Sequence, residues 1–152
     1  MRKDDNWLNR YQTMGDIAEA AFEQAADDDQ KRWDRYGLNR PKSNMSRWTP
    51  NIRYTPDYIQ HNRLVEVKGC GRDGLVKIKQ ENLEALRNWE AFAEMPVWLF
   101  CWNSQQEQSA MFELTSRFMR WLGDNCQNDR FPDNNKLYWE IPFTDCQEQP
   151  WL

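Results

Sequence analysis

Two carboxylates and an amine lie close together in the sequence, with a spacing that suits chemistry on an anion. Asp57 is followed, after eight intervening residues, by Glu66-Val67-Lys68. In an extended strand alternate side chains share a face, so Glu66 and Lys68 project together. Val65 and Val67 then project to the opposite face, where they can anchor the strand in a hydrophobic core.

A hairpin would bring the aspartate to the other two residues. Residues 51–59 and 63–69 both have the composition of strands, and the polar residues 60–62 between them suit a turn. Pairing of these strands returns Asp57 to the side of Glu66. The sequence therefore predicts that both carboxylates and the Lys68 ammonium converge within a few ångströms.

Such a group suits phosphodiester hydrolysis. Paired carboxylates hold a hard cation such as Mg²⁺ or Mn²⁺, which lowers the pKa of a bound water and neutralises charge on the phosphate. We expect Asp57 and Glu66 to bind this metal together with the backbone carbonyl of Val67. Lys68, protonated beside two acids, would orient the attacking water or stabilise the transition state.

The same residues resemble the signature of a known family. Pro56-Asp57 followed by Glu66-Val67-Lys68 is similar to the motif of the PD-(D/E)XK nuclease superfamily, whose restriction-endonuclease-like fold is a mixed β-sheet flanked by helices. Thr55-Pro56-Asp57-Tyr58 and Gly69 look most like the phage and archaeal Holliday-junction-resolving branch. The resemblance covers about the first two thirds of the chain and implies products with a 5′-phosphate. Residues 103–152 match nothing in the family pattern.

The resemblance also implies an acidic residue on the first helix. Gly15-Asp16-Ile17-Ala18-Glu19 is similar to the helix motif of the resolving enzymes, which makes Glu19 the candidate to complete the site. An acidic stripe at helical spacing can equally be a solvated helix face. Glu23, one turn further on, is the substitute candidate.

Two groups of residues are candidates for contact with nucleic acid. One group lies around the start of the helix expected after the catalytic strand, where the superfamily often places a Gln or Lys: Arg72, Lys77, Lys79 and Gln80. The other lies in a basic loop at residues 37–50: Arg40, Lys42 and Arg47. Residues 31–53 hold seven basic residues against one acid, interleaved with aromatic residues, a combination that suits phosphate neutralisation and ring stacking. The alternative is a set of solvated charges.

The order of expected elements agrees with this fold class. Apolar spacing and turn residues predict helices at 16–33 (with Thr13 as N-cap), 75–94 and 114–122, and strands at 51–59, 63–69, 97–102, 110–114 and 137–141. This order describes one α/β domain over residues 1–152, with a mixed sheet. The homodimer implied by small resolving enzymes would place two sites on opposed strands.

Composition excludes several classes of protein. Of 152 residues 39% are hydrophobic, which is enough for a core and too much for a disordered chain. No apolar run approaches the ~20 residues of a membrane span, and the first residues lack the pattern of a signal peptide, so we expect a cytoplasmic protein without a membrane partner. A net charge of −4 argues against indiscriminate binding to DNA.

The prediction is therefore a Mg²⁺-dependent DNA endonuclease, structure-specific for branched or junction DNA, from a phage or its host. Within the superfamily, an exonuclease and a restriction-type nuclease are alternatives. Outside enzymes, the alternative is a nucleic-acid-binding module that keeps the fold without turnover.

Overall fold

The computed structural model describes the backbone of residues 3–37 and 48–152, and side chains from residue 13 onward within those ranges. Its elements follow the order α1 (Lys3–Asp28), β1 (Asp34–Arg35), α2 (Pro50–Arg53), β2 (Tyr58–Gln60), β3 (Arg63–Gly69), β4 (Leu75–Lys79), α3 (Gln80–Ala93), β5 (Val97–Asn103), β6 (Gln108–Glu113), α4 (Ser116–Asn125), β7 (Gln127–Arg130), β8 (Leu137–Pro142) and α5 (Phe143–Glu148). None of the described helices combines the length and the apolar composition needed to cross a membrane.

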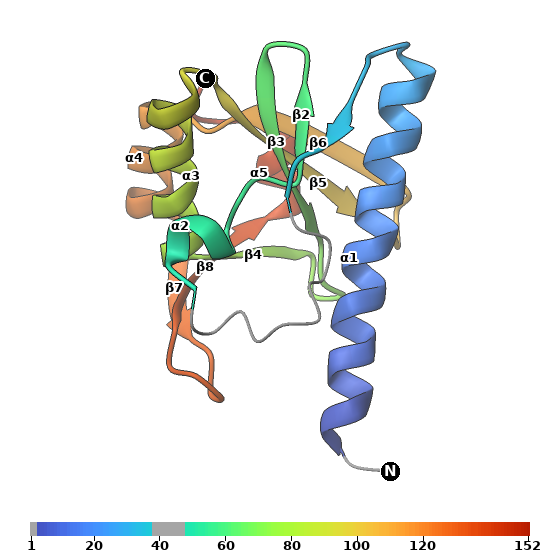
Figure 1. Ribbon diagram of the computed structural model, residues 1–152. Helices are drawn as coiled ribbons and strands as arrows, with labels where there is room; N and C mark the ends of the chain where they lie inside the picture. The colour runs from blue at the N-terminus through green and yellow to red at the C-terminus, as the bar shows by residue number, and fades with distance from the viewer. Residues whose placement is uncertain (1–2, 38–47) are drawn as a thin grey trace.

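A five-stranded mixed sheet forms the centre of the molecule, with the strand order β1-β2-β3-β5-β6 (Figure 1). β3 and β5 are parallel neighbours, and the other pairs are antiparallel. The apolar run of β5 is buried on both faces, as expected for a strand covered from two sides. This sheet is the mixed sheet that the sequence predicts.

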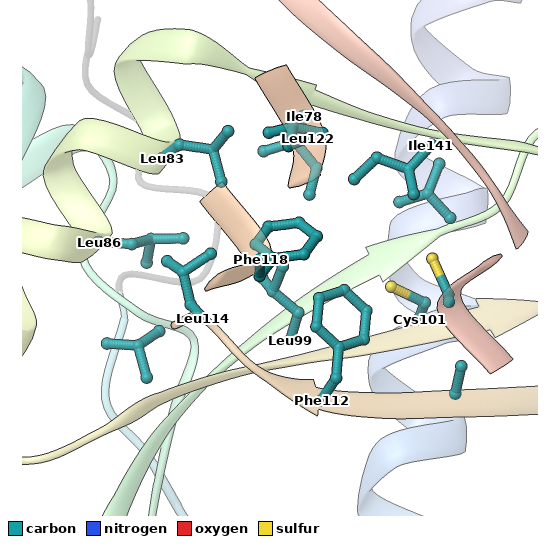
Figure 2. Close-up of a cluster of buried hydrophobic side chains, with 14 of the residues drawn as sticks. Ile78, Leu83, Leu86, Leu99, Cys101, Phe112, Leu114, Phe118, Leu122 and Ile141 are labelled. Carbon is teal, nitrogen blue, oxygen red and sulfur yellow. The ribbon is translucent and has the colours of Figure 1, made fainter. Parts of the chain in front are cut away.

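Helices cover both faces of this sheet. On one face α1 packs Ala18, Phe22 and Ala26 against Val65 and Val67 of β3. On the other face α3 and α4 build a larger core around β5, in which leucine and phenylalanine side chains meet (Figure 2). The valines of β3 therefore anchor the strand as expected, which leaves its alternate residues for the opposite side.

A second sheet, of three antiparallel strands in the order β4-β8-β7, was not expected. Residues 75–79 begin the predicted helix 75–94, yet they form strand β4, and the helix starts only at Gln80. Val76 and Ile78 are fully buried while Lys77 and Lys79 are not, which is the alternation of a strand. The helical spacing of Ile78 with Leu86 obscured this pattern.

Three further elements, α1, α2 and β7, differ from the prediction. α1 runs through Thr13, so this residue is no N-cap, and the helix ends before Trp33. Part of the expected strand 51–59 is helix α2, which has Pro50 in its first turn, where its missing N–H has no intrahelical partner to lose. β7 is wholly exposed and polar, so it carries no hydrophobic signal.

Candidate active site

The β2–β3 hairpin places Asp57 beside Glu66. Tyr58 pairs with Val65 across the two antiparallel strands, and Asp57 directly precedes this pair. The backbone N–H of Val67 donates a 2.8 Å hydrogen bond to Asp57 Oδ2, which fixes the carboxylate against the neighbouring strand. The chain turns at the exposed residues His61 and Asn62.

Glu66 and Lys68 share the face of β3 that points away from α1. The Lys68 ammonium donates to Glu66 Oε1 at 2.6 Å, and Asn82 of α3 donates to the same oxygen at 3.2 Å. Glu66 is only 5% exposed, and its second oxygen, Oε2, is buried with no hydrogen-bond partner among the described residues. A buried carboxylate oxygen without a donor is costly unless a cation or water occupies the space beside it.

The electrostatics of Asp57 indicate a shortage of positive charge. Burial and the nearby Glu66 carboxylate raise its pKa well above the usual value, although Lys68 and the Val67 N–H oppose the shift. Glu19 adds a smaller effect in the same direction as Glu66. The ionised form of this pair of carboxylates therefore gains from an additional cation.

These side chains line one large cleft. Its volume is about 1150 Å³, and its walls include Glu19, Asp57, Glu66 and Lys68. Gly69 is closely covered, because a Cβ there would lie 2.6 Å from the Met14 side chain of α1. The cleft exceeds the range of about 300–1,000 Å³ that is typical of small-molecule pockets.

The structure separates the two acidic candidates on α1. Glu19 lies at the cleft and accepts a 2.6 Å hydrogen bond from Arg35. The sequence did not predict this ion pair. Glu23 accepts from the hydroxyl of Tyr58 at 2.6 Å and is no part of the cleft wall. Of the two, only Glu19 is placed where it can act on the site.

The candidates for nucleic-acid contact fall into four groups. Arg72 and Lys77 line the cleft, with Lys77 paired to Asp73 at 3.2 Å. Lys79 lines an adjoining hollow of about 230 Å³ that shares Asp57, Glu66 and Lys68 with the cleft. Gln80 lines neither, because it accepts from the Trp139 indole and donates to Glu84. Arg40, Lys42 and Arg47, with most of the predicted loop 37–50, lie outside the described residues.

No protein-family model and no curated protein sequence matches this chain. Among solved structures it is similar to Hjc, a Holliday junction resolvase from the archaeal hyperthermophile Archaeoglobus fulgidus, with a TM-score of 0.53 and 10% identity over 89% of this chain and 88% of that one. It is also similar to D212, a nuclease from a fusselovirus, with a TM-score of 0.47 and 8% identity over 91% of this chain and 84% of that one. The chain has the restriction-endonuclease-like fold.

This likeness of fold extends beyond the sequence motif. Because the alignment with Hjc covers 89% of the chain, it includes much of residues 103–152, where the sequence shows no family pattern. Asn82, which holds Glu66 from α3, is a further site residue that no sequence signal indicated.

Divalent metal ions are the usual cofactors of this fold, and the residues present fit one. Asp57 and Glu66 supply oxygen ligands of the kind that Mg²⁺ and Mn²⁺ prefer, and the partnerless Glu66 Oε2 is an available donor. Within residues 13–37 and 48–152, no three His, Cys, Asp or Glu side chains are grouped closely enough to hold a metal. The described residues therefore offer Asp57 and Glu66 as two side-chain ligands. Two such ligands suit Mg²⁺, because this ion keeps several of its bound waters.

Proposed function

We propose that this protein is a metal-dependent DNA endonuclease that hydrolyses phosphodiester bonds and leaves a 5′-phosphate. One observation carries the proposal: two adjoining carboxylates and an ammonium line a single cleft of a restriction-endonuclease-like fold. Burial of Glu66 against Asn82 gives that group a fixed geometry. A group fixed in this way is suited to transition-state stabilisation, because little reorganisation is needed during reaction.

Each residue has a separate role in this proposal. Asp57, Glu66 and the carbonyl of Val67 would hold Mg²⁺ or Mn²⁺. When bound, the metal supplies Lewis acidity and a more acidic water. Lys68, held by Glu66, orients the attacking water and neutralises charge on the phosphate. Glu19, held by Arg35, supports a second cation or the position of Lys68.

Branched DNA is the substrate class that we propose. The Thr55-Pro56-Asp57-Tyr58 context resembles that of junction-resolving enzymes, and Hjc, which shares the fold, is a Holliday junction resolvase. We propose with it a homodimer, since two sites are needed to cut opposed strands of a junction. The basic residues of the loop 37–50 would bind the backbone, and the protein would work in the cytosol of a bacterium or of a phage-infected host.

Incubation with supercoiled plasmid and Mg²⁺ or Mn²⁺, with and without a chelator, tests the proposal. We expect metal-dependent nicking by the wild type, with four-way junctions cut faster than flaps or linear duplex of the same sequence. Lys68→Ala should abolish cutting and leave junction binding nearly unchanged. Substantial turnover by Lys68→Ala would contradict the role given to this lysine.

The same experiment distinguishes the alternatives. A non-catalytic binding module has one observation in its favour, because the described residues assemble no group of three metal-binding side chains. Junction binding by the wild type without cutting under any divalent metal would establish that alternative. Release of mononucleotides from linear ends would indicate an exonuclease, and cutting at one short duplex sequence would indicate a restriction-type enzyme.

A further inference from the structure

The second sheet presents a face of lysines and aromatic rings to the cleft. Leu75, Lys77 and Lys79 alternate with buried residues along β4, and Lys79 pairs with Tyr138 of β8 in the antiparallel register. Phe131 follows β7 at the end of the β7–β8 hairpin. Because Val76 and Ile78 fill the core from the other side, this outer face is available to a ligand.

The two rings and the two lysines form an interleaved cluster. Phe131 and Tyr138 have ring centroids 4.2 Å apart and lie at 30° to each other. Lys79 Nζ lies 5.6 Å from the Phe131 ring and Lys77 Nζ lies 5.7 Å from the Tyr138 ring. Phe131 lines both the main cleft and the adjoining hollow, so it borders the same space as Asp57, Glu66 and Lys68.

The charge of this cluster is only partly balanced. Lys77 pairs with Asp73, whereas Lys79 forms no ion pair with any carboxylate of the described residues. Lys79 is half-buried, and burial together with Lys136 and Lys68 lowers its pKa, although Glu81 and Asp133 act in the opposite direction. An anion placed between Lys79 and Lys68 would relieve this crowding of positive charge.

Glu81 of α3 holds the β7–β8 hairpin, which carries Phe131, and we call its contacts the Glu81 clamp. Glu81 accepts hydrogen bonds from both Lys136 of the hairpin and the Tyr54 hydroxyl, and Arg53 lies 3.6 Å away. The hairpin is therefore tied to the two elements that flank the site. A ring held in this way can bind a ligand without the entropic cost of ordering a loop.

From this arrangement we propose that the outer face of β4-β8-β7 binds an unpaired stretch of the substrate strand. Phe131 stacks on a base, and Lys79 binds a phosphate next to the one that is cut. A groove that combines cations with aromatic rings is the common solution for single strands, since every base offers a face for stacking. This inference rests on the proposed function and deepens it, because a nucleotide beside the cut at the branch point of the junction would be unpaired in the bound complex.

Binding of a short oligonucleotide that contains 2-aminopurine, with a chelator present, tests the proposal without any need for cleavage. The fluorescence of 2-aminopurine reports stacking, and a fully paired duplex of the same sequence serves for comparison. We expect Phe131→Leu to weaken single-strand binding about tenfold and to abolish the fluorescence change, because leucine keeps the apolar volume without a ring. Phe131→Trp should retain both.

Two controls separate stacking from a general loss of structure. Phe92→Leu removes the ring of a 79% exposed residue on α3 outside the cleft, and we expect it to bind like the wild type. Lys79→Gln should lower the slope of log affinity against log salt by about 0.7, the loss of one phosphate contact on a single strand.

Unchanged single-strand binding by Phe131→Leu, an equal loss on duplex and single strand, or no binding by the wild type would each overturn the inference. Ring-dependent binding by a protein that never cuts plasmid would support the inference while the proposed endonuclease activity fails.

Discussion

At the scale of single residues, the position of Asp57 beside Glu66 suits it to bind a cation. Without the cation, the charged form of Asp57 lowers the stability of the folded protein. Burial and Glu66 raise the pKa of Asp57, so the folded protein binds more protons than the unfolded chain above the ordinary aspartate pKa of about 4. Stability from this group is thus fully present at lower pH and is lost as the pH rises through the raised pKa.

Asp57→Asn should therefore stabilise the metal-free protein at neutral pH. The amide oxygen can still accept from the Val67 N–H, while the charge beside Glu66 is gone. We expect a Tm several degrees above that of the wild type with chelator, since 1 kcal/mol shifts Tm by about 2–4 °C for a chain of this size. The difference should shrink towards pH 4 in calorimetry. A variant less stable than the wild type at pH 7 would contradict the electrostatic account.

Glu19 and Glu23 form a matched pair on one helix. Glu19→Gln removes the charge at the cleft that holds Arg35, so we expect cutting to slow by about 10–100-fold, as for groups that support a metal site. Glu23→Gln should cut at nearly the wild-type rate, because its amide oxygen still accepts from the Tyr58 hydroxyl. Rates on one plasmid substrate compare them, and equal loss in both variants would show a structural effect of α1.

At the scale of elements, the sequence predicts the pairing of strands that are neighbours in the chain. It does not predict the pairing of strands that are far apart in the chain. The hairpin that brings Asp57 to Glu66 is made of two consecutive strands. The alternation of side chains and the polar turn were therefore enough to predict that the two carboxylates lie close together. The outer wall of the cleft depends on the pairing of β4 with β8, whose paired residues lie 59 to 67 positions apart. Nothing local in Phe131 or Tyr138 indicates that pairing.

The Glu81 clamp should control the β7–β8 hairpin. Glu81→Ala removes the acceptor shared by Lys136 and Tyr54, and loss of charged hydrogen bonds of this kind costs about 1–3 kcal/mol. We expect faster amide exchange across the hairpin and a higher KM on junction DNA, with a smaller change in kcat. Glu84→Ala, on an exposed turn of the same helix, is the control. Exchange unchanged by Glu81→Ala would show that the hairpin is held by its other contacts.

At the scale of the whole molecule, two hydrophobic cores lie on opposite faces of one sheet. Phe22 belongs to the core under α1, and Leu86 belongs to the core under α3 and α4. Both cores include side chains of β3 and β5, whose residues alternate between the faces. The candidate catalytic residues of β3 therefore depend on both layers, which is why we propose that residues 1–152 act as one domain.

Single-domain behaviour predicts one cooperative unfolding transition. Leu86→Ala should lower the free energy of unfolding by about 2–5 kcal/mol and Phe22→Ala by about 3–5 kcal/mol, because both side chains are almost fully buried. Since β3 and β5 join the cores, either variant should raise amide exchange in α1 and α3 together, as measured by mass spectrometry under conditions that favour global unfolding. Exchange raised in α1 alone by Phe22→Ala would show that the helix layer unfolds independently. In that case α1 could carry Glu19 away from the cleft while Asp57, Glu66 and Lys68 stayed in place, and metal binding would persist in a state that cuts more slowly.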